Sequence, residues 1–440
     1  MQMMKRTLIF AALIACGILS AHGQTALRLT LDDALAIALS DNPTVKIADQ
    51  EVTKSEYARK GAYAALFPTI DLGADYQRTV KKQTMYMDTG AGGTNKISVG
   101  MDNTWSSGVN ASMPVIAPAT WKSLKISGMD VENAVEKARQ SRIDMIEQVS
   151  NAFYAVLLAK DTYHVYREAY LNAEKNYRDI RQKFDAGSTS EYEAIRAEVY
   201  LRNAEPDMYE AEHSVALTEW QLKALLGMDL TREIECSGAL ADFGGEMIRT
   251  QAELVLDGNS ELRQLDIRER KLEKTVEMKR AENYPTLNLS FNYEWISMNN
   301  NFKFSSYQWN PYGVAGLSLK IPLFAGGKRR QDVRQAKIDL SQLRLERENM
   351  QRDLEVEWMQ YRNTLTTSIR QYDAAQASVT EAQKGYSIAV KRYDIGDGTQ
   401  LDINDAQLQL TQAQLARNQA IYNYMTSQAS LDALTGKYEN

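Results

Sequence analysis

Residue types that commonly carry chemistry are scarce in this 440-residue chain and are not grouped as a reaction site requires. They are the histidines His22, His164 and His213 and the cysteines Cys16 and Cys236. None of them has the spacing of metal ligands. The stretch GGKRR at 326–330 lacks the G-x-x-x-x-G-K-[ST] frame of a phosphate-binding loop. We therefore expect no enzyme activity, no metal and no cofactor.

One pair of acids has a spacing that could act on ions. Asp402 and Asp405 lie three residues apart in a segment of helical character. If a threefold axis brought three copies together, six carboxylates would surround it, concentrate cations and repel anions. Two solvated acids, one turn apart on a helix, explain the same spacing equally well.

The bulk composition describes a folded, exported protein. The chain is 44% hydrophobic and 25% charged, with a formal charge of -6, which argues against a nucleic-acid partner. Lys5 and Arg6 precede the apolar run TLIFAALIACGILSA, and small residues follow at 21–23. This pattern predicts a signal peptide over residues 1–23. LIAC, ending at Cys16, also fits a lipoprotein box, so Cys16 is either lipidated or removed with the signal.

The sequence contains two tandem copies of one pattern. FDAGSTSEYEA at 184–194 matches YDIGDGTQLDINDA at 393–406, and KALLG at 223–227 matches DALTG at 432–436. Such ordered self-similarity predicts structural repeats. We expect a first repeat over 24–227, a connecting segment over 228–251 and a second repeat over 252–440.

Each copy predicts the same order of elements. A helix of about 35 residues ends at Phe67-Pro68 or Tyr284-Pro285, because proline cannot continue it. A strand, a loop, a second strand, a long helix, a glycine turn and another helix follow. The long helix, about 121–185, has small or apolar residues alternating at spacings of four and three over more than seven heptads, which is a coiled-coil pattern. A plain elongated coiled coil explains the helices alone.

The strands favour a different architecture. Four segments of period two are expected at 68–80, 103–115, 285–297 and 310–322. About ten residues that alternate apolar and polar suit a tilted strand crossing a bilayer. Two soluble hairpins would alternate in the same way. Four strands cannot close a barrel, and an open strand edge is not tolerated in hydrocarbon. If these strands span a membrane, several chains must therefore contribute to one barrel. Three chains would supply twelve strands.

Together these motifs resemble the outer membrane efflux proteins of the TolC type. The resemblance rests on LTLDDALAIALSDNP near the start, FPTIDL and YPTLNL before the strands, IPLFAGGKRRQ after the fourth strand, and the two glycine turns. It implies a mainly α fold with a β-barrel contribution. In that fold two tandem repeats supply long coiled-coil helices to a periplasmic α-barrel, and four strands per chain join a trimeric 12-stranded outer-membrane β-barrel. The segment 228–251 would belong to an equatorial belt.

The resemblance also implies partners and site residues. A homotrimer in outer-membrane lipid, reaching into the periplasm, would serve as the passive exit duct of an efflux or type I secretion system. A periplasmic adaptor and an inner-membrane pump would open it. Adaptor-docking hairpin tips fall on Gly187, Ser188, Gly396, Asp397 and Thr399. The periplasmic gate falls on Asp402, Asp405, Tyr393 and Glu193.

One departure from the family pattern concerns the latch of the closed gate. Similar channels often have an arginine two residues after the second tip glycine, where this chain has Gly398. Closure is then expected to depend on packing and on the acidic ring. The alternative function is a non-channel periplasmic coiled-coil spacer or adaptor.

Overall fold

The computed structural model describes residues 27–88, 94–247 and 254–438, so the predicted signal peptide and Cys16 lie outside the described residues. The chain forms two compact units. Unit 1 takes in residues up to Asp49, 137–263 and those from 350 onward, and unit 2 takes in 50–136 and 264–349. Each unit therefore draws on both halves of the sequence.

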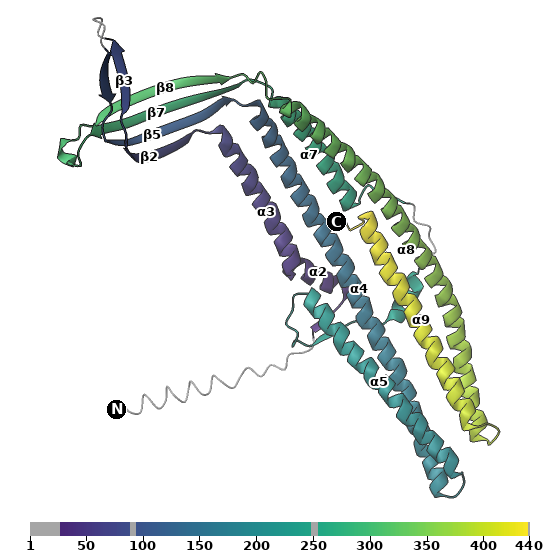
Figure 1. Ribbon diagram of the computed structural model, residues 1–440. Coiled ribbons are helices and arrows are strands. Elements are labelled where there is room, and N and C mark those ends of the chain that lie inside the picture. Colours follow the sequence, from purple (N-terminus) through teal and green to yellow (C-terminus); the bar gives the residue numbers. More distant parts are fainter. Residues whose placement is uncertain (1–26, 89–93, 248–253, 439–440) are drawn as a thin grey trace, which may run out of the picture. The chain divides into compact units, whose positions relative to one another are not determined.

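The described elements are long helices and a small number of strands (Figure 1). The helices are α2 (Leu31–Asp41), α3 (Pro43–Tyr63), α4 (Pro118–Asp185), α5 (Glu191–Leu225), α6 (Leu240–Phe243), α7 (Ser260–Ala281), α8 (Lys328–Asp394) and α9 (Gln400–Thr435). The strands are β1 (Leu27–Leu29), β2 (Thr69–Arg78), β3 (Gln83–Asp88), β4 (Thr94–Val99), β5 (Asn103–Ile116), β6 (Ile234–Cys236), β7 (Thr286–Asn299) and β8 (Asn310–Lys320). Among the described residues, no helix is long and apolar enough to cross a membrane.

Unit 2 contains an antiparallel sheet in the order β2-β5-β7-β8 (Figure 1). These are the four strands predicted from the sequence. Its register gives the sheet one apolar and one polar face, because successive side chains point to opposite sides. The apolar face includes Ile70, Leu72, Val109, Phe291 and Leu317. The polar face includes Asp71, Asp75, Asn110, Asn292 and Glu294.

Three features differ from the sequence prediction. The first helix is not continuous: α2 ends before Asn42, whose ψ of 128° is extended, as expected for a residue before proline. The loop between β2 and β5 contains a hairpin of β3 and β4. Finally, β6 in the connecting segment pairs in parallel with β1, a pairing of three residues that is too short to leave a periodic signal.

The core of unit 1 lies where α4 meets β1, α2, the end of α5 and the middle of α9. Phe153, Leu157, Leu222 and Ile421 are at most 1% exposed and pack in one cluster with Leu29. Four positions of the predicted heptad pattern on α4 are buried in this region, namely Met145, Val149, Val156 and Ala159. Burying such side chains contributes about 1.5–3 kcal/mol each.

Two equivalent hydrogen bonds show that the two sequence repeats share a local structure. The Asn42 amide donates to the carbonyl of Leu225 at the end of α5 (2.6 Å), and the Asn259 amide donates to the carbonyl of Leu434 at the end of α9 (2.9 Å). Each asparagine also accepts from a backbone N–H that follows it. The helices end at Gly227 and Gly436, with φ of 67° and 69°. The same side chain therefore caps the same helix end in both repeats.

We expect Asn259→Ala to destabilise the end of α9. Asn259 is 5% exposed, and its loss leaves the Leu434 carbonyl and the Leu262 N–H without this partner, at a cost of about 1–3 kcal/mol. Thermal melting followed by circular dichroism would show a lower midpoint. Asn203→Ala on the exposed face of α5 is the matched control. Equal melting curves for the two variants would contradict the capping role.

Candidate functional site

The candidate site consists of the two helix turns at the end of unit 1 (Figure 1). Gly187 ends α4 with φ of 69° and Gly396 ends α8 with φ of 82°. In the first turn the N–H of Ser188 donates to the Lys183 carbonyl at 2.8 Å, and in the second that of Asp397 donates to the Arg392 carbonyl at 2.9 Å. This is the glycine C-cap in which the left-handed residue satisfies the last carbonyls of the helix.

Asp402 has a local structural role that the sequence reasoning did not include. Its carboxylate accepts from the backbone N–H of Thr399 (2.8 Å) and from the Thr399 hydroxyl (2.9 Å). The Thr399 hydroxyl in turn accepts from the Asp402 N–H, which completes a capping box. These hydrogen bonds, the backbone one first, lower the pKa of Asp402 below its ordinary value. Asp405, one turn further along, is exposed.

Arg392 stabilises the second turn, although the sequence analysis did not single it out. Its guanidinium contacts the Asp397 carboxylate (3.1 Å) and donates to the Asp397 carbonyl (2.8 Å). A Cβ added at Gly398 would come within 3.0 Å of the Tyr393 nitrogen and 3.1 Å of the Arg392 Cβ. The position at which similar channels often have arginine therefore leaves little room for a side chain here.

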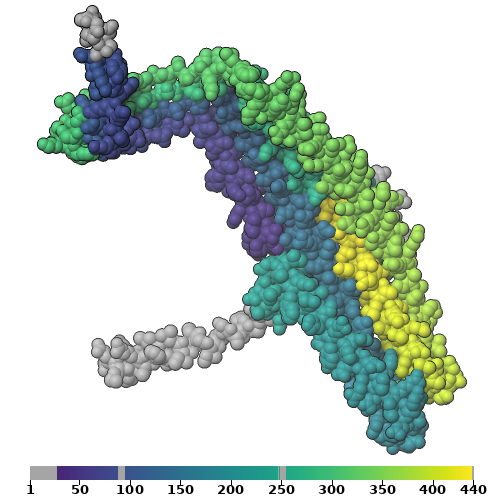
Figure 2. Space-filling model, in the orientation of Figure 1, coloured from purple at the N-terminus to yellow at the C-terminus, as the bar shows by residue number. Residues whose placement is uncertain are grey.

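Side chains of the two tips contact each other. Figure 2 shows the two hairpins, teal and yellow-green, side by side in unit 1. The Gln400 amide nitrogen, oriented toward Glu193, donates to the Glu193 carboxylate at 2.8 Å and to its carbonyl at 3.3 Å. Gln400 is 1% exposed. Tyr393 packs on the cluster of Ile180, Ala194 and Ala197 from the first hairpin. Two of the predicted gate residues, Glu193 and Tyr393, thus lie at the contact between the hairpins.

Tyr393 lies in a partly buried and charged setting. Burial raises the pKa of its phenol, and the nearby acids Glu193, Asp179 and Asp394 raise it further. The Lys183 ammonium lies 4.6 Å from the centre of its ring, within the range of a cation–π contact. Repeat spacing places Phe184 opposite Tyr393, so only the second repeat has a hydroxyl here.

The side of α9 that packs against the first hairpin has many buried polar side chains. Gln400, Asn404, Gln407, Thr411 and Asn418 are all at most 8% exposed. Their spacing of four, three, four and seven follows one heptad seam. Asn172 of α4 donates to Gln407 at 3.1 Å, and Gln407 donates to Thr411 at 3.3 Å. Hydrogen bonds as well as apolar packing therefore join the second hairpin to the first.

A groove of about 480 Å³ lies beside this contact. Asn172, Asp179 and Lys183 of α4 line one side, and Tyr386, Val390 and Tyr393 of α8 line the other. Ser188, one of the predicted tip residues, lies at the groove as well. The mixture of amides, charges and aromatic rings suits a polypeptide partner better than a small apolar ligand.

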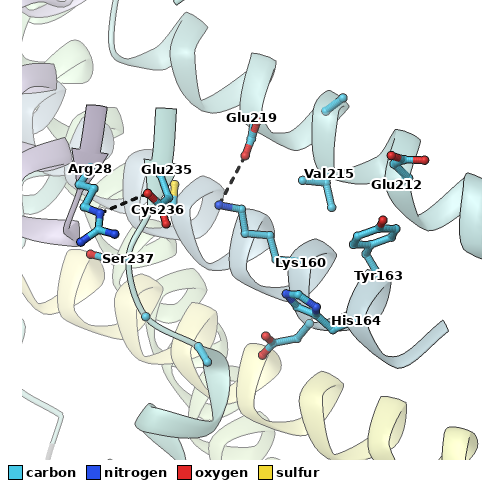
Figure 3. Close-up of a pocket in the computed structure, with 14 residues that line it drawn as sticks. Arg28, Lys160, Tyr163, His164, Glu212, Val215, Glu219, Glu235, Cys236 and Ser237 are labelled. Atoms are coloured by element: carbon cyan, nitrogen blue, oxygen red, sulfur yellow. Dashed lines mark hydrogen bonds and ion pairs between the residues drawn. The ribbon is translucent and has the colours of Figure 1, made fainter. Parts of the chain in front are cut away.

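A second cavity of unit 1, about 790 Å³, lies beside β6 (Figure 3). It contains two ion pairs, Lys160 with Glu219 at 3.5 Å and Arg28 with Glu235 at 3.2 Å. Cys236, which is 4% exposed, lines it too. Burial raises the pKa of the Cys236 thiol to about 11, so the thiol stays protonated at neutral pH and is a poor nucleophile. No group of described residues has the composition of a metal site.

Comparison with known proteins identifies the family. A model of the outer membrane efflux protein family matches residues 34–228 and again 252–437. The chain belongs to the outer membrane efflux protein family. The double match agrees with the two tandem repeats, and the family's α-barrel and β-barrel parts account for the long helices and the four-stranded sheet. The protein is an outer-membrane channel of this family, and the spacer or adaptor alternative finds no support.

Individual relatives are distant but extensive. Outer membrane protein TolC of Vibrio cholerae is 22% identical over 335 residues, covering 75% of this chain and 76% of that protein. The alkaline protease secretion protein AprF of Pseudomonas aeruginosa is 22% identical over 426 residues, covering 94% and 85%. The Campylobacter jejuni CmeC outer membrane channel has a TM-score of 0.72 at 21% identity, covering 92% of this chain and 85% of that chain, which is a likeness of fold.

We expect the Cys236 thiol to be inert in the folded efflux protein. A pKa raised from 9.0 to about 11 leaves about 100-fold less thiolate at pH 8 than an ordinary cysteine has, before access is considered. Because the folded state holds this proton more tightly, the thiol destabilises the fold as pH rises from 9 towards 11. Maleimide labelling should be slow in buffer and fast in guanidinium. Cys236→Ala combined with Ala241→Cys, an exposed site nearby, is the control, and equally fast labelling of the native protein would refute the expectation.

Proposed function

We propose that three copies of this efflux protein form one exit duct through the outer membrane. The observation that carries the proposal is the open sheet of unit 2, whose outer strands β2 and β8 each have one edge that pairs with no other described strand. Its four strands alternate in direction, so β8 of one copy can pair antiparallel with β2 of the next. Three copies would close twelve strands and leave no unpaired edge in the hydrocarbon.

The two faces of the sheet suit lipid outside and water inside. Ile70, Leu72 and Leu317 on the apolar face are 68%, 77% and 69% exposed, which is costly in water but favourable against lipid. On the opposite face Asp71, Asp75 and Glu294 would line an aqueous bore. Aromatic residues lie toward the end of the sheet away from the helices, where Tyr76 and Trp105 stack at 4.4 Å between ring centroids. This placement is typical of an interfacial girdle.

We propose that the helix tips of unit 1 form a gate in the periplasm. Asp402 and Asp405 from three copies would form a ring of six carboxylates, while Tyr393 and Glu193 join the two hairpins of each copy. The capping box supports this role, because hydrogen bonding keeps Asp402 ionised and fixes its position at the start of α9. The Gln400–Glu193 contact takes the place of the arginine latch that is missing at Gly398.

The tips and the groove between them are the proposed docking surface for a periplasmic adaptor. Gly187, Ser188, Gly396, Asp397 and Thr399 form the two turns, and the groove beside Tyr393 opens next to Ser188. The duct itself is passive and needs no cofactor, so an inner-membrane pump supplies the energy. The segment 228–251 between the repeats, which contains β6 and α6, would contribute to a belt around the helices.

Disulfide trapping tests the shared barrel. Within one chain β2 and β8 are separated by two strands, about 14 Å, which is too far for a disulfide. Pairs that combine Ala74→Cys with Gly313→Cys, Ala315→Cys or Leu317→Cys, in a Cys236→Ala background, all place both thiols on the apolar face. We expect at least one pair to give covalent dimers and trimers on a denaturing gel.

The single-cysteine variants are the controls for this experiment. Trimers that appear only with both cysteines support pairing between β8 and β2. The proposal is wrong if no pair gives covalent oligomers while the protein remains folded, or if detergent-extracted protein is a monomer.

Charge-neutral variants test the gate. Asp402→Asn keeps a carbonyl that can accept from Thr399, whereas Asp402→Ala removes both the charge and the cap. We expect Asp402→Asn with Asp405→Asn to reduce the cation preference of single channels, seen as a reversal potential closer to zero in a KCl gradient. Glu381→Gln, an exposed acid on α8 away from the tip, should change nothing. An unchanged reversal potential in the double variant would reject the acidic ring.

A further inference from the structure

The loops at the end of the sheet away from the helices are basic, although the whole chain is acidic. Residues 78–103 and 297–310 contain five basic and two acidic side chains, so their formal charge is 5 − 2 = +3, against -6 for the chain. The basic residues are Arg78, Lys81, Lys82, Lys96 and Lys303, and the acidic ones are Asp88 and Asp102. A local excess of this kind attracts anions.

Arg78 lies at the edge between the apolar face and these loops. It is the last residue of β2 and points to the same side as Ile70 and Leu72. Its guanidinium lies 5.7 Å from the centre of the Phe302 ring and donates to the Asn103 side chain at 3.4 Å. Within the described part of the chain it has no carboxylate partner. An exposed arginine is thus held in place with its charge uncompensated.

Hydrogen bonds hold the loop between β7 and β8 beside Lys82 and Asp102. Asn300 accepts from the Lys82 ammonium (2.9 Å) and from the Asp102 N–H (3.0 Å). Tyr307, which is 8% exposed, donates to the Asn301 carbonyl at 2.7 Å and stacks on Phe304. Contacts within the chain therefore hold this loop.

Apolar and charged groups alternate along the same loop. Phe302 and Phe304 are 54% and 62% exposed, and Lys303 lies between them in the sequence with no ion pair among the described residues. Phe304 also lies 5.6 Å from Trp105, ring centre to ring centre, so the loop continues the aromatic girdle. Exposed rings beside unpaired cations suit the interface of a membrane, where rings meet acyl chains and cations meet phosphates.

We propose that Arg78 and Lys303 bind the phosphate of a lipid headgroup in the outer leaflet. Guanidinium groups bind phosphate oxygens through paired hydrogen bonds, and cations near an anionic lipid surface are attracted to it. Phe302 and Phe304 select a lipid over free phosphate, because only a lipid brings hydrocarbon with its phosphate. The proposal rests on the proposed membrane-spanning sheet and assigns a ligand to its outer rim.

Native mass spectrometry of the detergent-solubilised protein tests the site. The probes are a bisphosphorylated glycolipid and the same glycolipid after removal of its phosphates. We expect the phosphorylated form to bind more tightly, and Arg78→Gln with Lys303→Gln to weaken its binding roughly 10- to 30-fold. Millimolar inorganic phosphate should not displace it. Lys96→Gln on β4 removes one charge from the same loops, as Arg78→Gln or Lys303→Gln alone does, and should leave binding nearly unchanged.

The possible outcomes separate this proposal from the exit duct. Equal binding of the two glycolipids, displacement by inorganic phosphate, or an equal loss in Lys96→Gln would overturn the phosphate site even in an intact trimer. If the disulfide experiment finds no trimer, the duct fails and the lipid site fails with it. Retention of the oligomer on a gel shows that the Arg78 and Lys303 variants are folded, so their loss of binding would support the site.

Discussion

The structure depends on one constraint, which is that the backbone along β2 and β8 must find partners. These strands have 10 and 11 residues, and in hydrocarbon every unpaired N–H or C=O costs several kcal/mol. Because each repeat supplies two strands, a chain has an even number, and its edge strands run in opposite directions. A copy added at either edge therefore continues the antiparallel order, and the sheet can close by rotational symmetry alone.

The two helical hairpins are held together at their tips by a different kind of interaction from the one that closes the sheet. Packing at the tips combines small apolar residues, such as Ala194 and Ala197, with buried amides on α9. A purely apolar seam of this length would be stable in several registers, whereas a buried amide is satisfied only where its partner lies opposite. Contacts such as Asn172–Gln407 therefore set the register of the second hairpin on the first. They give specificity at some cost in stability, which would suit a contact that opens in the proposed gate.

Local sequence patterns predicted the helices and strands. Most features that the sequence did not predict depend on contacts between segments far apart in the chain. The strands were found because a slip of one residue would exchange their two faces, so the alternation has only one solution. The glycine turns at Gly187 and Gly396 are equally local. Asn42 ends α2 through a hydrogen bond to Leu225, 183 residues away, and Gln400 meets Glu193 across the repeats, so neither contact is visible in a short window. The Thr399–Asp402 capping box is the exception, because its T-x-x-D pattern could have been read directly.

The two tips are built from the same turn but are not equivalent, which bears on how such a duct opens. In the second tip Arg392 holds Asp397 and Asp402 holds Thr399, so the turn is closed by its own side chains. Gln400 then reaches the first tip, where its counterpart in the repeat is the exposed Glu191. Because its own side chains hold the second turn together, that turn would move as a rigid unit. A change in the diameter of the duct would then occur at the contacts between the hairpins. Next to Tyr393 those contacts combine an apolar cluster with the Gln400–Glu193 hydrogen bond, and the groove beside Tyr393 is where we propose that a docking partner acts.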